Sequence, residues 1–156
     1  MTIAVFDIDG VVADVRHRLH HLDGRPKDWD GFFAAATADP PLATGRRLAA
    51  ELAAQHEIVW LTGRPERIRT PTLNWLRAHD LPGVELYMRS DADRRPARLY
   101  KLGVLARLRP RGIAAFVDDD DEVVDAALKA GLPALLADWV PRAQPLRDAQ
   151  GRLGRT

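Results

Sequence analysis

The stretch IAVFDIDG, residues 3–10, decides the fold of this chain. Ile3 to Phe6 form a short continuous apolar run, which is typical of a strand buried on both faces. Asp7 and Asp9 follow at once, two residues apart and therefore on the same side of an extended chain, and Gly10 permits a sharp turn. A buried strand that ends in two carboxylates predicts a ligand site, because open parallel sheets bind ligands at the carboxyl ends of their strands.

Further apolar runs predict the rest of a sheet. The clear ones are Glu57–Leu61 and Ile113–Val117, and the weaker ones are Val84–Met88 and Ala134–Ala137. Helical patterns lie between these runs, over Leu42–Gln55, Glu66–His79, Ala97–Leu108 and Asp121–Ala130. The alternation predicts an α/β protein with a three-layer, Rossmann-like arrangement and a central parallel sheet of about five strands.

Two segments depart from the alternation. Residues 14–41 form a small insertion after the first strand, in which we expect a short helix near Trp29 to Ala36. Residues 141–156 hold two prolines and two glycines with few large apolar groups, which predicts a loosely packed C-terminal tail. We therefore expect residues 1–140 to form a single domain.

Composition excludes several classes of protein. The 156 residues carry 23 Lys+Arg against 22 Asp+Glu, a net charge of +1 that argues against a histone-like nucleic-acid binder. There is no cysteine, which excludes thiolate catalysis, Fe–S clusters and disulfides. No apolar run approaches the ~20 residues that cross a bilayer, and no targeting segment is visible, so we expect no membrane association and a cytoplasmic protein.

Acidic side chains follow the predicted fourth strand as well as the first. Asp118 and Asp119 would join Asp7 and Asp9 at one edge of the sheet, where so many carboxylates stay ionised only beside a cation. Oxygen ligands without His or Cys favour Mg²⁺. The alternative is a helix N-cap, which we prefer for the last two acids of the run, Asp120 and Asp121, whereas Asp118 favours the metal and Asp119 is even on this argument.

Four further residues are candidates for phosphate binding at this edge of the sheet. Thr62, Gly63 and Arg64 follow the second strand, where a hydroxyl and free N–H groups make a plausible phosphate seat, although Thr-Gly is also an ordinary helix cap. Lys101 lies on the helix before the fourth strand. In isolation it is better read as a surface lysine, but it is one of only three lysines beside 20 arginines, and a compact ammonium suits a phosphoryl oxygen.

These residues resemble the four ordered motifs of the haloacid dehalogenase (HAD) superfamily of phosphatases. The motifs read Asp7-Ile8-Asp9-Gly10, Leu61-Thr62-Gly63-Arg64, Lys101 and Phe116-Val117-Asp118-Asp119, and the likeness spans residues 3 to about 131. The resemblance implies an HAD-like fold and an aspartyl-phosphate formed on Asp7, with Asp9 as general acid and then base. It implies that Thr62 and Lys101 hold the phosphoryl group. It also implies that Mg²⁺ is bound by Asp7, the main-chain carbonyl of Asp9, and Asp118 or Asp119.

Within the superfamily, the chain looks most like the 3′-phosphatase domain of phage-type polynucleotide kinase. The likeness rests on the brief insertion with Asp28-Trp29-Asp30, the Gly-Arg of the second motif and Val123-Val124. Val11 and Asp120 depart from that pattern, and no phosphate loop of a kinase is present. We expect a Mg²⁺-dependent phosphomonoesterase that acts on nucleic-acid 3′ ends. The alternatives are a small-metabolite phosphatase for sugar phosphates or nucleotides, and a regulatory module that binds phosphate without turnover.

The size of the insertion predicts only a minimal cap and therefore an open site, to which a polymer end or a partner surface has access. Residues 89–111 hold eight basic groups against two acids, which indicates either a patch for an anionic substrate or a solvated arginine-rich helix. His17, His20 and His21 are better explained as a helix surface near the site than as metal ligands. Trp29 and Phe32-Phe33 could stack a base, but we expect them to anchor the insertion.

Overall fold

A five-stranded parallel sheet forms the centre of the computed structural model, which describes all residues 1–156. The strand order is β3-β2-β1-β4-β5, and every neighbouring pair is parallel. The strands are β1 (Ile3–Phe6), β2 (Glu57–Pro65), β3 (Glu85–Arg89), β4 (Ile113–Asp118) and β5 (Ala134–Leu136). The predicted α/β architecture with about five parallel strands is confirmed.

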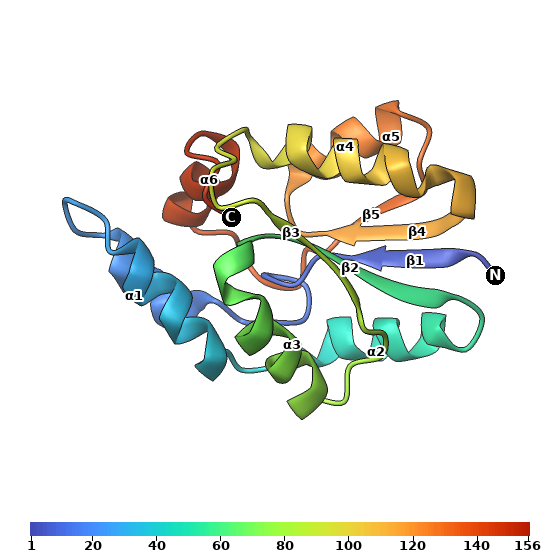
Figure 1. Ribbon diagram of the computed structural model, residues 1–156, viewed down its shortest axis with the longest axis horizontal. Coiled ribbons are helices and arrows are strands. Elements are labelled where there is room, and N and C mark those ends of the chain that lie inside the picture. Colours follow the sequence, from blue (N-terminus) through green and yellow to red (C-terminus); the bar gives the residue numbers. More distant parts are fainter.

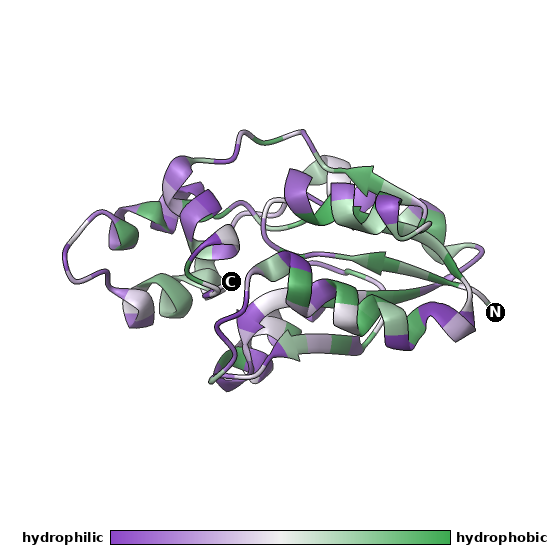
Figure 2. Cartoon of the chain, turned by 90° about the horizontal axis from the view of Figure 1, so that it is seen from above, coloured by the Kyte–Doolittle hydropathy of each residue, from purple (hydrophilic) through white to green (hydrophobic).

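Two helices cover each face of the sheet (Figure 1). One face carries α2 (Ala43–Ala53) and α3 (Arg69–Ala78), and the other carries α4 (Ala97–Leu108) and α5 (Asp121–Lys129). The side chains of β1 alternate between the two resulting cores: Phe6 packs with Trp75 of α3, while Val5 packs with Leu105 of α4. Figure 2 shows largely hydrophobic strands at the centre and helices in which hydrophobic and hydrophilic residues alternate.

Strand β2 is longer than the sequence indicates. Its apolar run ends at Leu61, but the strand continues to Pro65 with a register irregularity against β3. The short 3-10 helix η3 (Glu66–Ile68) then leads into α3. Thr62 and Gly63 therefore lie on the irregular end of a strand and not at the cap of a helix. The sequence did not indicate this part of β2 because its residues are not apolar.

The C-terminal tail is packed, contrary to our expectation. It forms helix α6 (Gln144–Gly151), whose Leu146 and Ala149 are buried against Phe32 and Phe33 of the insertion. The two buried α6 residues are three apart and so share one side of the helix. The small apolar cluster of the insertion needs this cover, which a count of large apolar residues in the tail alone does not reveal.

The insertion consists of three short helices beyond the carboxyl ends of the strands. They are the 3-10 helix η1 (Arg16–Leu22), α1 (Trp29–Ala34) and the 3-10 helix η2 (Ala35–Ala38). In Figure 1, α1 and α6 lie at the end of the molecule toward which the strands run. None of the helices has the length and apolar character that crossing a bilayer requires.

Candidate active site

Three carboxylates meet where β1 and β4 end. The backbone N–H of Asp7 donates to the carbonyl of Val117 at 2.9 Å, which places Asp7 beside Asp118. Asp7, Asp118 and Asp119 each offer an oxygen within 4.8 Å of the others, and all three are buried. We call these three residues the acid cluster. It has the donor set of a divalent-cation site, because hard cations prefer carboxylate oxygens.

Asp119 is the member that most needs a cation. Both of its carboxylate oxygens are buried and have no hydrogen-bond partner. Its side chain lies against Gly10, where a Cβ would collide with the Asp119 Oδ2. The backbone of Gly10, with φ of 78°, therefore leaves the room that this carboxylate occupies. A buried carboxylate without a partner is costly, so the cluster fits a metal ion as its missing partner.

Lys101 reaches the cluster from α4. Its Nζ lies 2.6 Å from Asp118 Oδ2 and 3.1 Å from Asp7 Oδ1, and the residue is 2 % exposed. Burial by itself lowers the pKa of Lys101, but the two carboxylates outweigh burial and raise it, so the ammonium is charged. The interpretation of Lys101 as a surface lysine, which its sequence surroundings alone favour, is therefore wrong.

Burial dominates the protonation of the acid cluster. It raises the pKa of Asp7 to about 8, with Lys101 acting in the opposite direction and Asp118 adding to the rise. Burial also raises the pKa of Asp119 well above its usual range, and Asp7 and Asp118 add like-charge repulsion. Without a cation, the cluster therefore holds protons that free carboxyl groups would release.

This protonation predicts how stability depends on pH in protein stripped of divalent cations. The pKa of Asp7 is about 8 in the folded protein against 3.8 for a free aspartate side chain, so the folded state binds more protons between these values. The free energy of unfolding should then fall as pH rises from 5 to 8. Urea unfolding with chelator should show this fall, and Mg²⁺ should stabilise the protein more at pH 8 than at pH 5. An equal effect of Mg²⁺ at both pH values would contradict the cation site.

Asp9 is not part of the acid cluster and pairs with two arginines. Arg64 Nη2 lies 2.6 Å and Arg18 Nη2 3.0 Å from Asp9 Oδ1, and all three side chains are buried. Burial raises the pKa of Asp9, but the pairs with Arg64 and Arg18 outweigh burial and lower it to about 2. A general acid needs a raised pKa to keep its proton, whereas in this arrangement the pKa of Asp9 is lowered and its carboxyl is ionised.

Asp39 completes a buried ion network that the sequence did not indicate. Its carboxylate accepts from Arg18 at 2.8 and 2.9 Å, from Arg64 at 3.0 Å and from His17 at 2.6 Å. We call Asp9, Arg18, Asp39 and Arg64 the ion network. Arg18 is fully buried although it stands among exposed polar residues of η1, so no periodicity distinguished it. Asp39 stands before Pro40 at the end of the insertion, and nothing in its sequence surroundings indicates a buried ion pair.

Arg64, which we expected at the phosphate, therefore contacts Asp9, Asp39 and the Thr72 hydroxyl of α3. Its backbone N–H donates to the Thr62 hydroxyl at 3.2 Å. Thr62 itself is 1 % exposed in the C-terminal half of β2, which pairs with β1, the strand that Asp7 and Asp9 follow. The second motif thus lies at the same edge of the sheet as the acid cluster.

The site is covered and not open. Asp7, Asp9, Thr62, Lys101 and the other acids of the cluster are each at most 4 % exposed. Part of the cover comes from the tail: Thr156 lies on Gly63, where a Cβ would collide with its carbonyl carbon, and its hydroxyl is 3.4 Å from Asp9 Oδ2. The expectation of an open site is wrong because the C-terminal tail, and not the insertion alone, covers the site.

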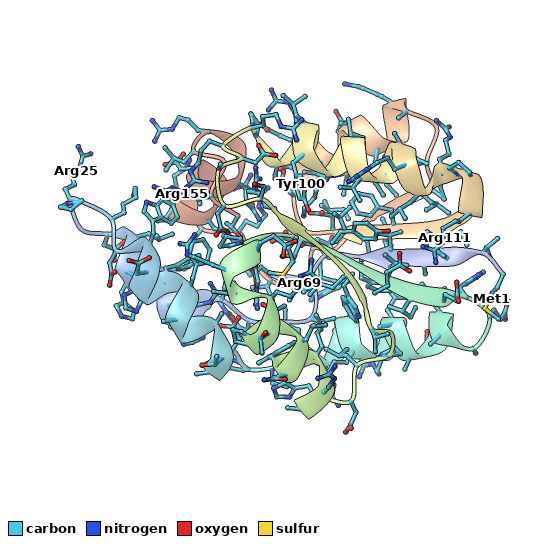
Figure 3. The ribbon with its side chains drawn as sticks, viewed as in Figure 1. Met1, Arg25, Arg69, Tyr100, Arg111 and Arg155 are labelled. Atoms are coloured by element: carbon cyan, nitrogen blue, oxygen red, sulfur yellow. The ribbon has the colours of Figure 1, made fainter.

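The other residues singled out in the sequence make structural contacts. Asp120 caps α5, accepting from the Glu122 N–H at 3.0 Å, as the alternative for that residue predicted. The eight basic groups of residues 89–111 do not form one patch: Arg111 pairs with Glu85, Arg95 pairs with Asp93, and Arg89 is buried. Figure 3 shows Arg111 at the end of the molecule where Met1 lies, opposite the end where Arg155 of the tail lies.

The histidines of the insertion belong to no group of metal ligands. His17 pairs with Asp39 at 2.6 Å and His21 with Asp28 at 2.9 Å, and the only cluster of ligating side chains in the molecule is the acid cluster. Phe32 and Phe33 are buried and anchor the insertion, as expected. Trp29 is half-buried, with one of its neighbours an arginine of the tail.

The parallel sheet, with its acid cluster and buried lysine at the strand ends, defines a phosphatase of the HAD superfamily. Residues 1–138 match the family model of the phosphatase domain of polynucleotide kinase PNKP, and the chain belongs to this family. The predicted resemblance is therefore confirmed. No curated protein sequence matches the chain.

Solved structures show the same fold. A chain described as "Structure of the Pnkp1/Rnl/Hen1 RNA repair complex" superposes with a TM-score of 0.71 at 22% identity, over 86% of this chain and 42% of that one. An HAD-like hydrolase from Streptococcus pneumoniae gives 0.66 at 13% identity, over 97% and 92% of the two chains. The class C acid phosphatase of Bacillus anthracis gives 0.64 at 14% identity, over 86% and 65%. The chain thus spans less than half of the RNA repair protein it resembles.

Proposed function

We propose that the chain is a Mg²⁺-dependent phosphomonoesterase that removes the 3′-phosphate from nucleic-acid ends through an aspartyl-phosphate on Asp7. One observation carries the proposal: Asp7, Asp118, Asp119 and Lys101 converge at the strand ends of a chain whose residues 1–138 match the PNKP phosphatase domain. The family match supports the nucleic-acid substrate, and the cluster supports the chemistry.

Mg²⁺ would be held by the carboxylates of Asp7, Asp118 and Asp119, together with the main-chain carbonyl of Asp9. The unpartnered oxygens of Asp119 support this assignment. Bound there, the ion would offset the negative charge of the cluster and the charge that develops on the phosphoryl oxygens.

Asp7 is the proposed nucleophile. Its carboxylate oxygen attacks phosphorus, the bond from phosphorus to the ester oxygen breaks, and an acyl phosphate remains on the enzyme. Attack requires the ionised form, which burial opposes. Lys101, at 3.1 Å, favours that form and would also contact the phosphoryl oxygens, with the Thr62 hydroxyl and the Gly63 N–H on the side of β2.

Asp9 would protonate the leaving oxygen and later take a proton from the water that hydrolyses the acyl phosphate. In the observed arrangement its ion pairs with Arg64 and Arg18 favour the ionised form, which has no proton to give. Its carboxyl must therefore leave the arginines before it acts as an acid. An anionic substrate that contacts Arg64 would compete for the same guanidinium and so loosen Asp9, which also gives Arg64 a part in phosphate binding.

A substrate panel tests the proposal. With Mg²⁺, kcat/KM for a single-stranded oligonucleotide with a 3′-phosphate should exceed that for glucose 6-phosphate and for the same oligonucleotide with a 5′-phosphate. Equal values across the panel would contradict the nucleic-acid assignment.

A small-metabolite phosphatase is the second candidate, and the burial of the site favours it. Every acid of the site is at most 4 % exposed, so a small ester needs less rearrangement than a polymer end. In that case a sugar phosphate or a mononucleotide would be the best substrate of the same panel. Binding of phosphate and Mg²⁺ with no turnover of any compound would instead indicate the regulatory module.

A further inference from the structure

A groove lies between the insertion and the C-terminal tail, next to the covered site. Its volume is about 480 Å³, and its lining residues are Pro26, Lys27, Trp29, Arg94, Leu153 and Arg155. We call it the basic groove. The residues come from three separate segments, namely the insertion, the loop before α4 and the tail. Leu153 and Arg155 lie beyond residues 1–138, so the family match does not cover the tail wall of the groove.

The lining of the groove holds three cations and no acidic residue. Lys27, Arg94 and Arg155 line it, and none of the three forms an ion pair with a carboxylate within 4.0 Å, whereas most arginines of this chain do. The Lys27 ammonium and the Arg94 guanidinium donate only to backbone carbonyls. Such a concentration of cations on a nearly neutral protein attracts a polyanion.

Arg155 shows the effect of this crowding. Its guanidinium carbon lies 4.9 Å from the centre of the Trp29 ring. Burial lowers its pKa, and the neighbouring Arg94 and Arg67 lower it further, with Asp30 acting in the opposite direction. In Figure 3, Arg155 stands at the end of the molecule where the insertion and α6 lie. A polyanion in the groove would relieve the repulsion among these arginines.

The C-terminal tail connects the groove with the covered site. Gly154 packs on the backbone of Arg94, and Thr156, the residue after Arg155, touches Gly63 and Asp9. One segment of the tail thus forms a wall of the groove and part of the cover of the site. A chain whose end reaches Asp7 would have its preceding phosphates beside Lys27, Arg94 and Arg155 and a base near the half-buried Trp29.

We infer that the basic groove binds the single-stranded nucleic acid that precedes the 3′ end, through its phosphates and through stacking of a base near Trp29. The inference rests on the proposed function and adds the place where the polymer is held. Single strands suit the groove because cations that follow the backbone and an aromatic ring are the common means of binding them without sequence preference.

Fluorescence anisotropy tests the inference with a labelled oligonucleotide, about ten nucleotides long, that ends in a 3′-hydroxyl. This probe has no phosphate to lose, so its binding reports the groove independently of catalysis. The double variant Arg94→Gln/Arg155→Gln should weaken binding by about tenfold or more and reduce the slope of log K against log salt by about 1.4, two contacts at about 0.7 each. Arg47→Gln, an exposed arginine of α2, is the matched control and should change neither.

Lys27→Gln extends the test to the opposite wall, because the tail variants could act by moving the tail. It should lower the salt slope by about 0.7. Unchanged binding in both the Lys27 and the double variant would overturn the inference, even if the wild type removes 3′-phosphates. Conversely, groove-dependent binding by a protein that prefers sugar phosphates would contradict the proposed function and leave the groove standing. Tighter binding of a duplex than of a single strand would overturn the single-strand assignment.

Discussion

Replacing Asp7 with asparagine is expected to lower kcat/KM for p-nitrophenyl phosphate by about 10⁴-fold or more, because the amide cannot form the acyl phosphate. The fold should survive. The change removes a carboxyl group whose ionisation burial opposes, and an amide of the same shape can still accept from Lys101. Initial rates with Mg²⁺ measure the loss, and urea unfolding without the cation should show a stability no lower than that of the wild type.

A trapped phosphoenzyme gives a second, covalent readout. Rapid acid quenching with a radiolabelled substrate should label the wild type and leave Asp7→Asn unlabelled. Asp125→Asn is the matched control, since this carboxylate lies on the exposed side of α5 with a side chain 67 % exposed. It should keep both activity and labelling. Wild-type activity in Asp7→Asn would remove Asp7 from the role of nucleophile.

The parts of the site that could be predicted are those fixed by the sheet. Asp7 follows β1 and Asp118 ends β4, and the two strands are hydrogen-bonded neighbours. A buried apolar run followed by an acid is visible in the sequence, and parallel strands bring such ends together. Lys101 could be placed through the resemblance alone, because nothing in its helical neighbourhood distinguishes a buried lysine from a surface one.

The parts that could not be predicted depend on contacts between segments far apart in the chain. The burial of Arg18 and Asp39 depends on their ion pair, and on the further pairs of Arg18 with Asp9 and of Asp39 with Arg64. A charged residue that is buried by its partner leaves no apolar pattern. The tail is a similar case: Leu146 and Ala149 are few, but the aromatic cluster of the insertion supplies the rest of that small core.

The ion network and the packed C-terminal tail, neither of which was predicted, both contact Asp9. The ion network keeps its carboxylate charged, and Thr156 contributes to its cover. The observed structure therefore combines the acid cluster with an ionised Asp9, the residue that we propose as the general acid. The proposed mechanism would require a rearrangement around Asp9 but none in the β1–β4 scaffold, since Lys101 already contacts both Asp7 and Asp118.

The variant Asp9→Asn separates proton transfer from nucleophilic attack. We expect it to lower kcat/KM for a 3′-phosphorylated oligonucleotide by about 10²- to 10⁴-fold, the usual contribution of a general acid. The loss for p-nitrophenyl phosphate should be smaller, because nitrophenolate leaves without a proton. Since the asparagine also lacks the base that activates water, the phosphoenzyme should accumulate with this substrate, and steady-state rates with rapid quenching measure both effects.

Structural damage would give a different pattern. The amide introduced by Asp9→Asn keeps an oxygen for Arg64 but leaves the two arginines with Asp39 as their only carboxylate, so some loss of stability is expected, within the roughly 3–5 kcal/mol that breaking a buried ion pair costs. A merely weakened fold would reduce the rates for both substrates by the same factor and would trap no phosphoenzyme. Such a result would show that Asp9 serves the ion network alone, because only a proton donor makes the loss depend on the leaving group.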